Sequence, residues 1–312
     1  MSIRKVAIIG AGHVGSHCAS ALAFLRAADV ITLVDRDGGK AKAQAMDAAD
    51  SVSFLPYSVT IKSGEYSDCA DADITVIAVG KPRLPGQTRL DLLDDSVHMA
   101  RDAAACLKES GFDGIVISIT NPADIIADCI RKELQKERWQ AFSTGTLLDT
   151  ARLIRILSEL TGCGHEKIHA FALGEHGDSS MIPFSDITID GVPFDDIKGI
   201  SRERVLERTH GIGMDIINGK GSTEFGIGLA LATMVKAIFD DEKRIMPASV
   251  LLEGEYGQKS VHCGVPCVIG RSGIEKIIEL PLTPEEKEQL NQSCDIIRQY
   301  INRADKLPHI KN

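Results

Sequence analysis

The sequence of 312 residues lacks any long hydrophobic run and carries fewer basic than acidic residues. No apolar stretch reaches the roughly 18 residues of a membrane-spanning helix. Asp and Glu number 44 against 35 Lys and Arg, which gives a formal net charge of −9. A surface of this sign disfavours nonspecific binding to nucleic acid. No signal-peptide pattern precedes the first strand-like segment, so we expect a cytoplasmic protein with neither nucleic acid nor a membrane as partner.

The eight cysteines are scattered along the chain. None belongs to a CxxC pair, and the closest two in sequence are Cys263 and Cys267. Disulfide frameworks are rare in long cytosolic chains, and no second Cys or His pair follows at the spacing of a zinc finger. We therefore expect no disulfides and no metal site, and interpret most cysteines as small buried apolar residues.

Short apolar runs alternate with helical segments in the first half of the chain. Such runs are typical of buried parallel strands, and the alternation predicts an α/β fold with a doubly wound parallel sheet. The expected strands cover residues 5–10, 30–34, 74–79 and 115–119, and the expected helices cover 13–25, 38–50, 91–109 and 122–135. Two prolines and a glycine in 81–86 indicate a loop directly after a strand.

The pattern becomes less regular after residue 144. Strands are expected near 168–173, 185–189, 248–252 and 265–269, and helices near 148–161, 202–218, 224–239 and 284–302. The last helix opens with a capping residue, a first-turn proline and early acids. Because no repeat and no low-complexity linker appears, we expect two directly joined domains, residues 1–144 and an α+β domain over 145–312.

A glycine-rich turn follows the first expected strand. Gly10 permits a tight turn, Gly12 lets a pyrophosphate approach the backbone, and Gly15 permits close packing of helix on strand. Asp35 stands twenty residues later at the end of the second strand, where a carboxylate binds the adenosine ribose and repels a 2′-phosphate. The pattern predicts a Rossmann-type domain over 1–144 that binds NAD rather than NADP. The alternative is an ordinary turn with a solvent-facing Asp.

An acid, a cation and a histidine gather between residues 149 and 178. His176 lies among small and acidic residues and is suited to exchange a proton with a substrate hydroxyl. Asp149 is a candidate partner that fixes the histidine tautomer. Arg152 shares a helix side with Asp149, and its planar fork suits a carboxylate. Taken singly, the histidine is more often structural, and the Asp–Arg pair is more often a surface ion pair.

Two arginines flank the proline–glycine turn of the loop after the third expected strand. Arg83 and Arg89 would be carried by a loop that closes over a substrate, excludes water and polarises a carbonyl. The alternative is a basic surface loop.

The combined motifs resemble the L-lactate/malate dehydrogenase family over essentially the full length of the chain. The matching positions are 10–15, 35, 83–89, 120–122, 149–152, 174–178, 220–223 and 252–257. The resemblance implies an NAD-dependent L-2-hydroxy-acid dehydrogenase that forms a homodimer or homotetramer. In it, His176 would be the catalytic acid/base with Asp149 as partner, and Arg152 would clamp the substrate carboxylate. Arg89 would polarise the carbonyl, and Asn121 would contact cofactor and substrate.

The resemblance contains features of both malate and lactate enzymes. Lactate enzymes of the family usually carry Gln where this chain has Arg83, and malate enzymes carry Arg. Thr223, in contrast, matches a pocket position at which malate enzymes tend to have a smaller residue. We weigh Arg83 more heavily, since an arginine closed against a methyl group would leave its charge unpaired. The sequence thus favours malate and oxaloacetate, with lactate or a bulkier 2-hydroxy acid as the alternative.

The sequence also bears on regulation by a sugar phosphate. Some bacterial lactate dehydrogenases are activated by fructose 1,6-bisphosphate through a His and an Arg at a subunit interface. His169 matches the first, but Ile154 stands at the arginine position, so this activation is not expected.

Two other functions were considered for the chain. An NAD-dependent glycosidase would be longer and would need a metal site. A non-catalytic dinucleotide-binding protein would be expected to have lost His176, Asp149 or an arginine.

Overall fold

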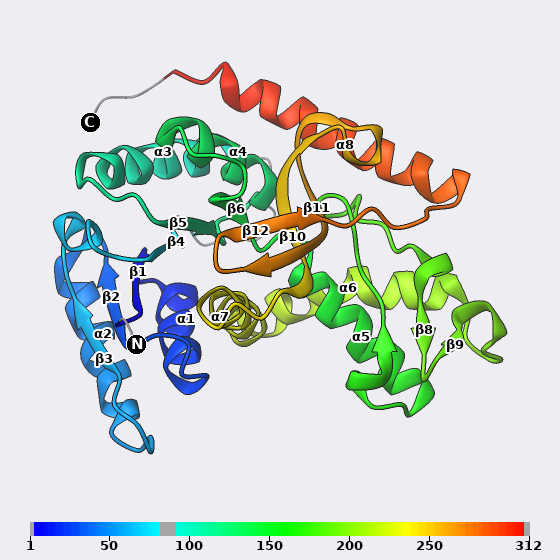
Figure 1. Ribbon diagram of the computed structural model, residues 1–312, viewed down its shortest axis with the longest axis horizontal. Coiled ribbons are helices and arrows are strands. Elements are labelled where there is room, and N and C mark those ends of the chain that lie inside the picture. Colours follow the sequence, from blue (N-terminus) through cyan, green and yellow to red (C-terminus); the bar gives the residue numbers. More distant parts are fainter. Residues whose placement is uncertain (1–2, 82–91, 309–312) are drawn as a thin grey trace.

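The computed structural model describes residues 3–81 and 92–308. Its main element is a nine-stranded sheet in the order β12-β11-β10-β6-β5-β4-β1-β2-β3. Six strands from the first half of the chain pair in parallel: β1 (Lys5–Ile9), β2 (Val30–Val34), β3 (Thr60–Ser63), β4 (Ile74–Ile77), β5 (Ile115–Ser118) and β6 (Ala141–Ser143). This arrangement confirms the predicted doubly wound parallel sheet (Figure 1).

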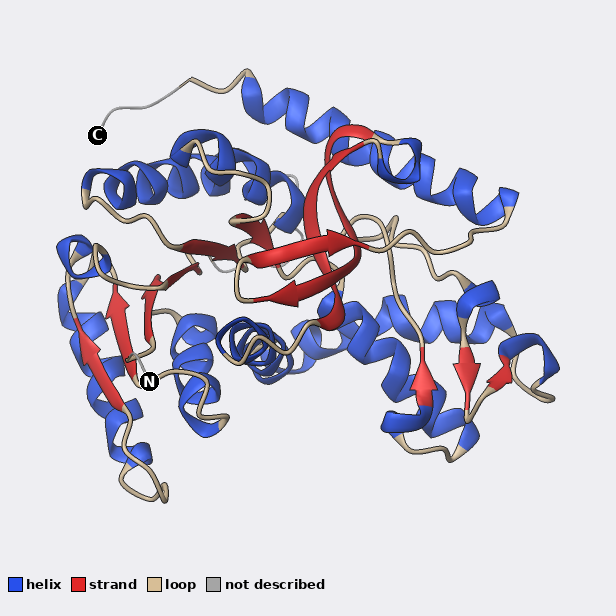
Figure 2. Ribbon diagram, viewed as in Figure 1, coloured by secondary structure: helices blue, strands red, loops and turns tan. Residues whose placement is uncertain are grey.

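Three strands from the second half extend the same sheet in antiparallel fashion. They are β10 (Arg244–Glu253), β11 (Lys259–Gly270) and β12 (Gly273–Ile277). The junction with the parallel part is the pairing of β10 with β6, at Ser249 opposite Ser143. A separate three-stranded sheet contains β7 (Ile168–His169), β8 (Thr188–Ile189) and β9 (Val192–Pro193), and lies apart from the main sheet in Figure 2.

Helices cover both faces of the main sheet. The eight α-helices of the described residues are α1 (His13–Phe24), α2 (Gly38–Val52), α3 (Leu93–Glu109), α4 (Ala123–Leu134), α5 (Leu147–Thr161), α6 (Arg202–Lys220), α7 (Phe225–Phe239) and α8 (Pro284–Asp305). Helix α1 packs against α2 and α7, and α4 packs against α3 and α8 (Figure 1). These two groups of helices lie on opposite sides of the sheet, as expected for right-handed crossovers between parallel strands.

The sequence prediction was incomplete for the short and the antiparallel strands. It missed β3, β6, β9 and β12, and it indicated only 248–252 and 265–269 where β10 and β11 are ten and twelve residues long. It was also too generous at 168–173 and 185–189, where β7 and β8 are two residues each. The long antiparallel pair is stabilised by cross-strand contacts, which local sequence preference does not report.

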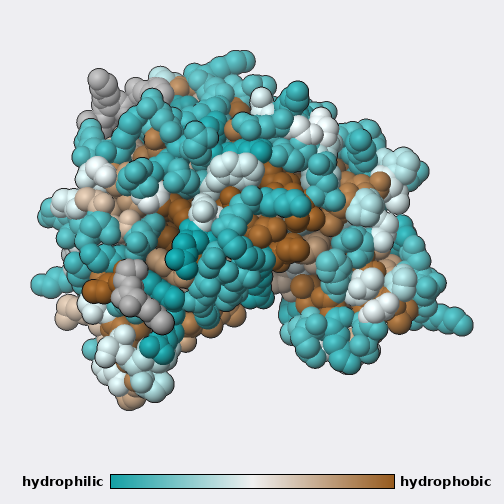
Figure 3. Space-filling model, in the orientation of Figure 1, coloured by the Kyte–Doolittle hydropathy of each residue, from teal (hydrophilic) through white to brown (hydrophobic). Residues whose placement is uncertain are grey.

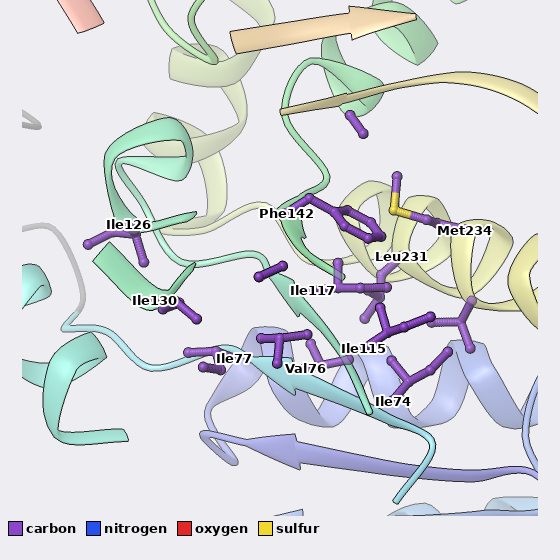
Figure 4. Packing of buried hydrophobic residues seen from close by; sticks show 14 of the residues in the cluster. Ile74, Val76, Ile77, Ile115, Ile117, Ile126, Ile130, Phe142, Leu231 and Met234 are labelled. Carbon is purple, nitrogen blue, oxygen red and sulfur yellow. The ribbon is translucent and has the colours of Figure 1, made fainter. Parts of the chain in front are cut away.

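The core lies between the sheet and its helices. Side chains of β4, β5 and β6, including Ile77, Ile117 and Phe142, form one cluster with Ile126 of α4 and Leu231 of α7 (Figure 4). A smaller second cluster joins α5 and α6 to the three-stranded sheet. Residues of both clusters flank the connection that carries His176.

The C-terminal helix α8 begins as its sequence predicted. Thr283 and Glu286 form a reciprocal capping box around Pro284, in which the Thr283 hydroxyl accepts from the Glu286 amide at 3.2 Å. The Glu286 carboxylate also accepts from the Ser185 amide at 3.0 Å, which ties the start of the helix to the segment just before β8. At the other end, the Arg101 guanidinium of α3 donates to carbonyls near the end of α8 at 3.0 Å. Helix α8 is therefore fixed at both ends.

Candidate active site

The glycine-rich turn between β1 and α1 has the backbone geometry that its sequence predicted. Gly10 has φ of +106°, and a Cβ there would lie 2.5 Å from the Ala78 carbonyl oxygen. A Cβ on Gly15 would lie 1.9 Å from the Gly10 carbonyl oxygen. A side chain at either position would collide with backbone, so both glycines are required for the turn and for the close approach of α1 to β1.

Gly12 and Asp35 border the space in front of the α1 N-terminus. The atom nearest to a Cβ on Gly12 would be Lys40 Nζ, at 3.9 Å, so the backbone there is open to a ligand. Asp35 accepts hydrogen bonds from the Ala11 amide at 2.8 Å and the Asp37 amide at 3.0 Å. Exposed backbone N–H groups at a helix start favour an anion, and the adjacent carboxylate is placed for ribose hydroxyls. The turn thus fits the pyrophosphate and ribose of a dinucleotide.

Three predicted site residues meet at the start of α5. His176 Nδ1 lies 2.6 Å from Asp149 Oδ2, and Arg152 Nη1 donates to Asp149 Oδ1 at 3.2 Å. The three side chains are 12–14% exposed. A Cβ on Gly213 of α6 would lie 3.4 Å from Arg152 Nη1, so this glycine makes room for the guanidinium. Asp149 therefore contacts both the histidine and the arginine, and the Asp149–Arg152 ion pair exists within the site.

The loop that carries His176 is held by residues from distant elements. Gly174 and Gly264 of β11 exchange two backbone hydrogen bonds of 2.9 Å each. The Glu175 amide donates to Ser293 Oγ of α8 at 2.8 Å. The His176 amide donates to Asp124 Oδ2 of α4 at 2.9 Å. Three consecutive amides are thus bound by three different elements.

Asp124 and Ser293 were missed by the sequence analysis. Asp124 is 1% exposed, and its burial raises the pKa of the carboxyl to about 6. A visible signal was the placement of Asp124 in a helix whose neighbouring positions are apolar, since a buried carboxyl requires a partner. Ser293 carries no such signal, because its partner lies 118 positions away.

Two of the remaining predicted site residues lie near the ends of helices. Asn121 is exposed just before α4, and Thr223 is partly exposed between α6 and α7. Arg83 and Arg89 lie outside the described residues. His169 and Ile154 line one cavity of about 240 Å³ together with Arg244, and His169 Nε2 lies 3.1 Å from Asp186 Oδ2.

Within 3–81 and 92–308, no group of three or more His, Cys, Asp or Glu side chains is arranged to hold a metal ion. In the same part of the chain, no helix has both the length and the apolar character needed to cross a membrane.

Comparison with known proteins identifies the family. A model described as lactate/malate dehydrogenase, NAD binding domain, matches residues 4–143, and one described as lactate/malate dehydrogenase, alpha/beta C-terminal domain, matches residues 146–307. The chain belongs to the lactate/malate dehydrogenase family. It is therefore an NAD-dependent oxidoreductase that acts on the CH–OH group of a small 2-hydroxy acid.

Individual members of the lactate/malate dehydrogenase family match along nearly the whole chain. An L-lactate dehydrogenase of Fusobacterium nucleatum is 40% identical over 309 residues, covering 96% of this chain and 97% of the relative. A solved lactate dehydrogenase from a Medee basin deep-sea metagenome library has a TM-score of 0.93 and 34% identity, covering 98% of this chain and 100% of that one. The solved malate dehydrogenase of Aeropyrum pernix has a TM-score of 0.90 and 33% identity, covering 96% and 97%.

Proposed function

We propose that the reaction takes place beside His176, with Asp149 as its partner. The observation that carries this assignment is the 2.6 Å contact between His176 Nδ1 and Asp149 Oδ2. NAD supplies or accepts the hydride at carbon 2 of the acid. The carboxylate at Nδ1 fixes the tautomer and stabilises the imidazolium, so Nε2 is the nitrogen that we assign to proton exchange with the substrate oxygen.

Arg152 is assigned to the substrate carboxylate. Its planar guanidinium offers two parallel N–H donors, which match the two carboxylate oxygens. Gly213 leaves space beside this group, and the ion pair with Asp149 keeps it oriented next to His176. Substrate and proton carrier are then held by one helical turn of α5.

Four further assignments rest on the chain positions of the residues. Asn121 is assigned to cofactor and substrate, and Thr223 to the substrate pocket. Arg89 is assigned to polarising the carbonyl of the 2-oxo acid. The turn of Gly10, Gly12 and Gly15, with Asp35, is assigned to the dinucleotide, as its open backbone and adjacent carboxylate support.

The proton-transfer role predicts a specific loss in His176→Asn. Turnover should fall by roughly 10²–10⁴, the usual contribution of a positioned general acid, while NADH binding stays near wild type. Steady-state kinetics and NADH fluorescence titration measure the two quantities. His169→Asn is the matched control, because this exposed histidine also contacts a carboxylate, Asp186 at 3.1 Å, and it should keep wild-type turnover. Unchanged turnover in His176→Asn would remove this residue from the chemistry.

For the substrate, we propose malate and oxaloacetate, on the chain position of Arg83. A guanidinium closed into the pocket would pair with the distal carboxylate. A charge-assisted pair of about 1.5–3 kcal/mol corresponds to about ten- to a hundredfold preference in kcat/KM over pyruvate. Arg83→Gln should shift the preference toward pyruvate. The control is Lys81→Gln, a nearby cation that pairs with Asp95 at 2.7 Å and should leave the preference unchanged.

Lactate and pyruvate are the second candidate. The relative from Fusobacterium nucleatum is an L-lactate dehydrogenase at 40% identity, and Thr223 resembles that branch. If wild-type enzyme turns over pyruvate more efficiently than oxaloacetate and Arg83→Gln changes little, the lactate assignment replaces the malate assignment. A bulkier 2-oxo acid that exceeds both would point to a larger pocket.

We also propose a cytoplasmic homodimer or homotetramer whose domains cover residues 1–144 and 145–312. The family matches, which end at 143 and resume at 146, support this division. The surface over β10 supports self-association, because hydrophobic residues gather there in Figure 3 and Ile245 is 49% exposed. The eight cysteines are free thiols, which fits a reducing compartment.

A further inference from the structure

The carboxylate of Asp124 is an unexpected choice for binding a backbone amide. A neutral Asn or Ser oxygen could also accept the His176 N–H, without placing a charge in the interior. Asp124 is 1% exposed, and Oδ1 has no hydrogen-bond partner among the described residues. The buried Ser249 hydroxyl nevertheless faces the carboxyl closely enough to lower its pKa, against the larger effect of burial. Burying a carboxylate costs free energy that a neutral acceptor at this position would not cost.

Charged groups face His176 from three parts of the described structure. Helix α5 contributes Asp149 and Arg152, α4 contributes Asp124, and the loop contributes Glu175, whose carboxylate accepts from Ser179 Oγ at 2.6 Å. Around them, α8 and β10 contribute the hydroxyls of Ser293 and Ser249. The negative charge of Asp149 is partly offset by its ion pair with Arg152. Asp124 therefore adds a second negative charge close to His176, at the backbone amide rather than at the ring nitrogen that Asp149 contacts.

We propose that Asp124 is a positioning residue for His176. It holds the loop through the His176 amide, and its buried negative charge stabilises the protonated imidazole. The inference rests on the proposed role of His176 in proton transfer. It adds a second carboxylate that acts through the backbone, beside Asp149, which contacts the ring itself.

The charge of Asp124 depends on pH. Burial raises the pKa of this carboxyl to about 6, so it is neutral well below that pH and charged above it. The protonated carboxyl retains an oxygen that accepts the amide. The loop contact is thus expected at all pH values, but the electrostatic contribution is present only above pH 6 or so.

The test compares Asp124→Asn with wild type in the direction of 2-oxo-acid reduction, which consumes a proton. Asn keeps an oxygen for the His176 amide and removes the charge. We expect the alkaline limb of kcat/KM to move to lower pH by about one unit, the effect of one nearby charge in a partly buried site. The loss should approach tenfold above about pH 7 and should disappear below about pH 5.5, where wild-type Asp124 is also neutral.

Asp128→Asn is the matched control. Asp128 lies one turn further along α4, is also buried, and contacts Lys132 at 2.6 Å and His262 at 3.2 Å. Its removal takes away a buried charge on the same helix, and the limb should stay at its wild-type position. If Asp128→Asn moves the limb as far as Asp124→Asn, the effect is not specific to Asp124 and the inference is overturned.

A purely structural role gives a different result. An equal loss of kcat/KM in Asp124→Asn at every pH, or no loss at any pH, overturns the inference. If Asp124→Asn fails to fold, Ser249→Ala replaces it, because loss of the hydroxyl raises the pKa of Asp124 and should move the limb in the same direction by less. An unmoved limb there overturns the inference as well.

Failure of the inference is distinguishable from failure of the proposed function. Inactive His176→Asn together with an unmoved limb in Asp124→Asn refutes only the role of Asp124. Fully active His176→Asn refutes the proposed proton transfer itself.

Discussion

At the scale of single residues, the proposed role of Asp35 in the choice of cofactor follows from its contacts with the glycine-rich turn. Its two oxygens accept the amides of Ala11 and Asp37, so the carboxylate is fixed at the end of β2. A 2′-phosphate at this position would lie next to a negative charge that the two hydrogen bonds hold in place. Lys40 Nζ, 3.8 Å from Asp35, reduces this repulsion without removing it.

The Asp35→Ser variant should narrow the preference for NADH over NADPH. Removal of one charge in contact with the phosphate is expected to change the ratio of the two kcat/KM values by about tenfold, or 1.4 kcal/mol. Asp37→Ser is the control, because serine can replace the aspartate that caps α2 by accepting from the Lys40 amide. Comparable rates with both cofactors in wild-type enzyme would contradict the assignment of Asp35.

The residues that sequence analysis could predict belong to short motifs. Asp149 and Arg152 are three positions apart, so their spacing places both on one side of a helix, and the glycines of the turn are contiguous with β1. Their proposed roles came from the resemblance of these motifs, taken together, to the family. Asp124 and Ser293 support the same histidine from helices α4 and α8. Their contribution depends on how those helices pack, and that information is distributed over the whole chain.

At the scale of elements, the position of the His176 loop depends on its crossing with β11. A Cβ on Gly264 would lie 2.6 Å from Thr146 Oγ1 and 2.9 Å from the Gly174 carbonyl oxygen. The two hydrogen bonds between Gly174 and Gly264 therefore require glycine on the β11 side. Strand β11 acts as the support against which the loop is placed.

Gly264→Ala should displace the loop and lower kcat by tenfold or more, while NADH binding at the distant glycine-rich turn stays unchanged. A misplacement of about 1 Å at a reacting group is sufficient for losses of this order. Gly219→Ala is the control, because a Cβ there has open space and should leave kcat unchanged. Wild-type kcat in Gly264→Ala would show that the loop tolerates the shift.

The predictability of the elements follows their length and partners. β1, β2, β4 and β5 are runs of Ile and Val buried in a parallel sheet, and each was found. β6 is the three residues Ala141–Ser143, too short for a pattern, and β3 is a mixed edge strand. Their strand conformation comes from pairing with neighbours, which tertiary packing supplies.

At the scale of the whole molecule, the main sheet crosses the boundary between the two proposed domains. Only Ser143 and Ser249 pair between β6 and β10, yet the hydrophobic core is continuous across this junction. The second half of the chain therefore continues the sheet of the first half, and β10 begins with the exposed residues Arg244 and Ile245, which line the cavity of about 240 Å³.

Ile245→Glu should weaken self-association. A charge placed in an apolar interface is costly to bury, so the mass measured by analytical ultracentrifugation should fall toward that of one 33.6 kDa chain. Val192→Glu on β9 is the control, since this residue is also exposed but lies on the small sheet. An unchanged mass in Ile245→Glu would move the interface to another face.

The contact between Ser293 of α8 and the Glu175 amide affects the order in which parts of the newly synthesised protein can fold. The dinucleotide-binding half is synthesised first, and nascent chains generally fold from the N-terminus onward. Ser293, which binds the Glu175 amide, belongs to α8, which follows all the other described elements in the chain. The first half can therefore acquire its fold during translation, whereas the loop with His176 obtains the contact with Ser293 only after α8 has been synthesised.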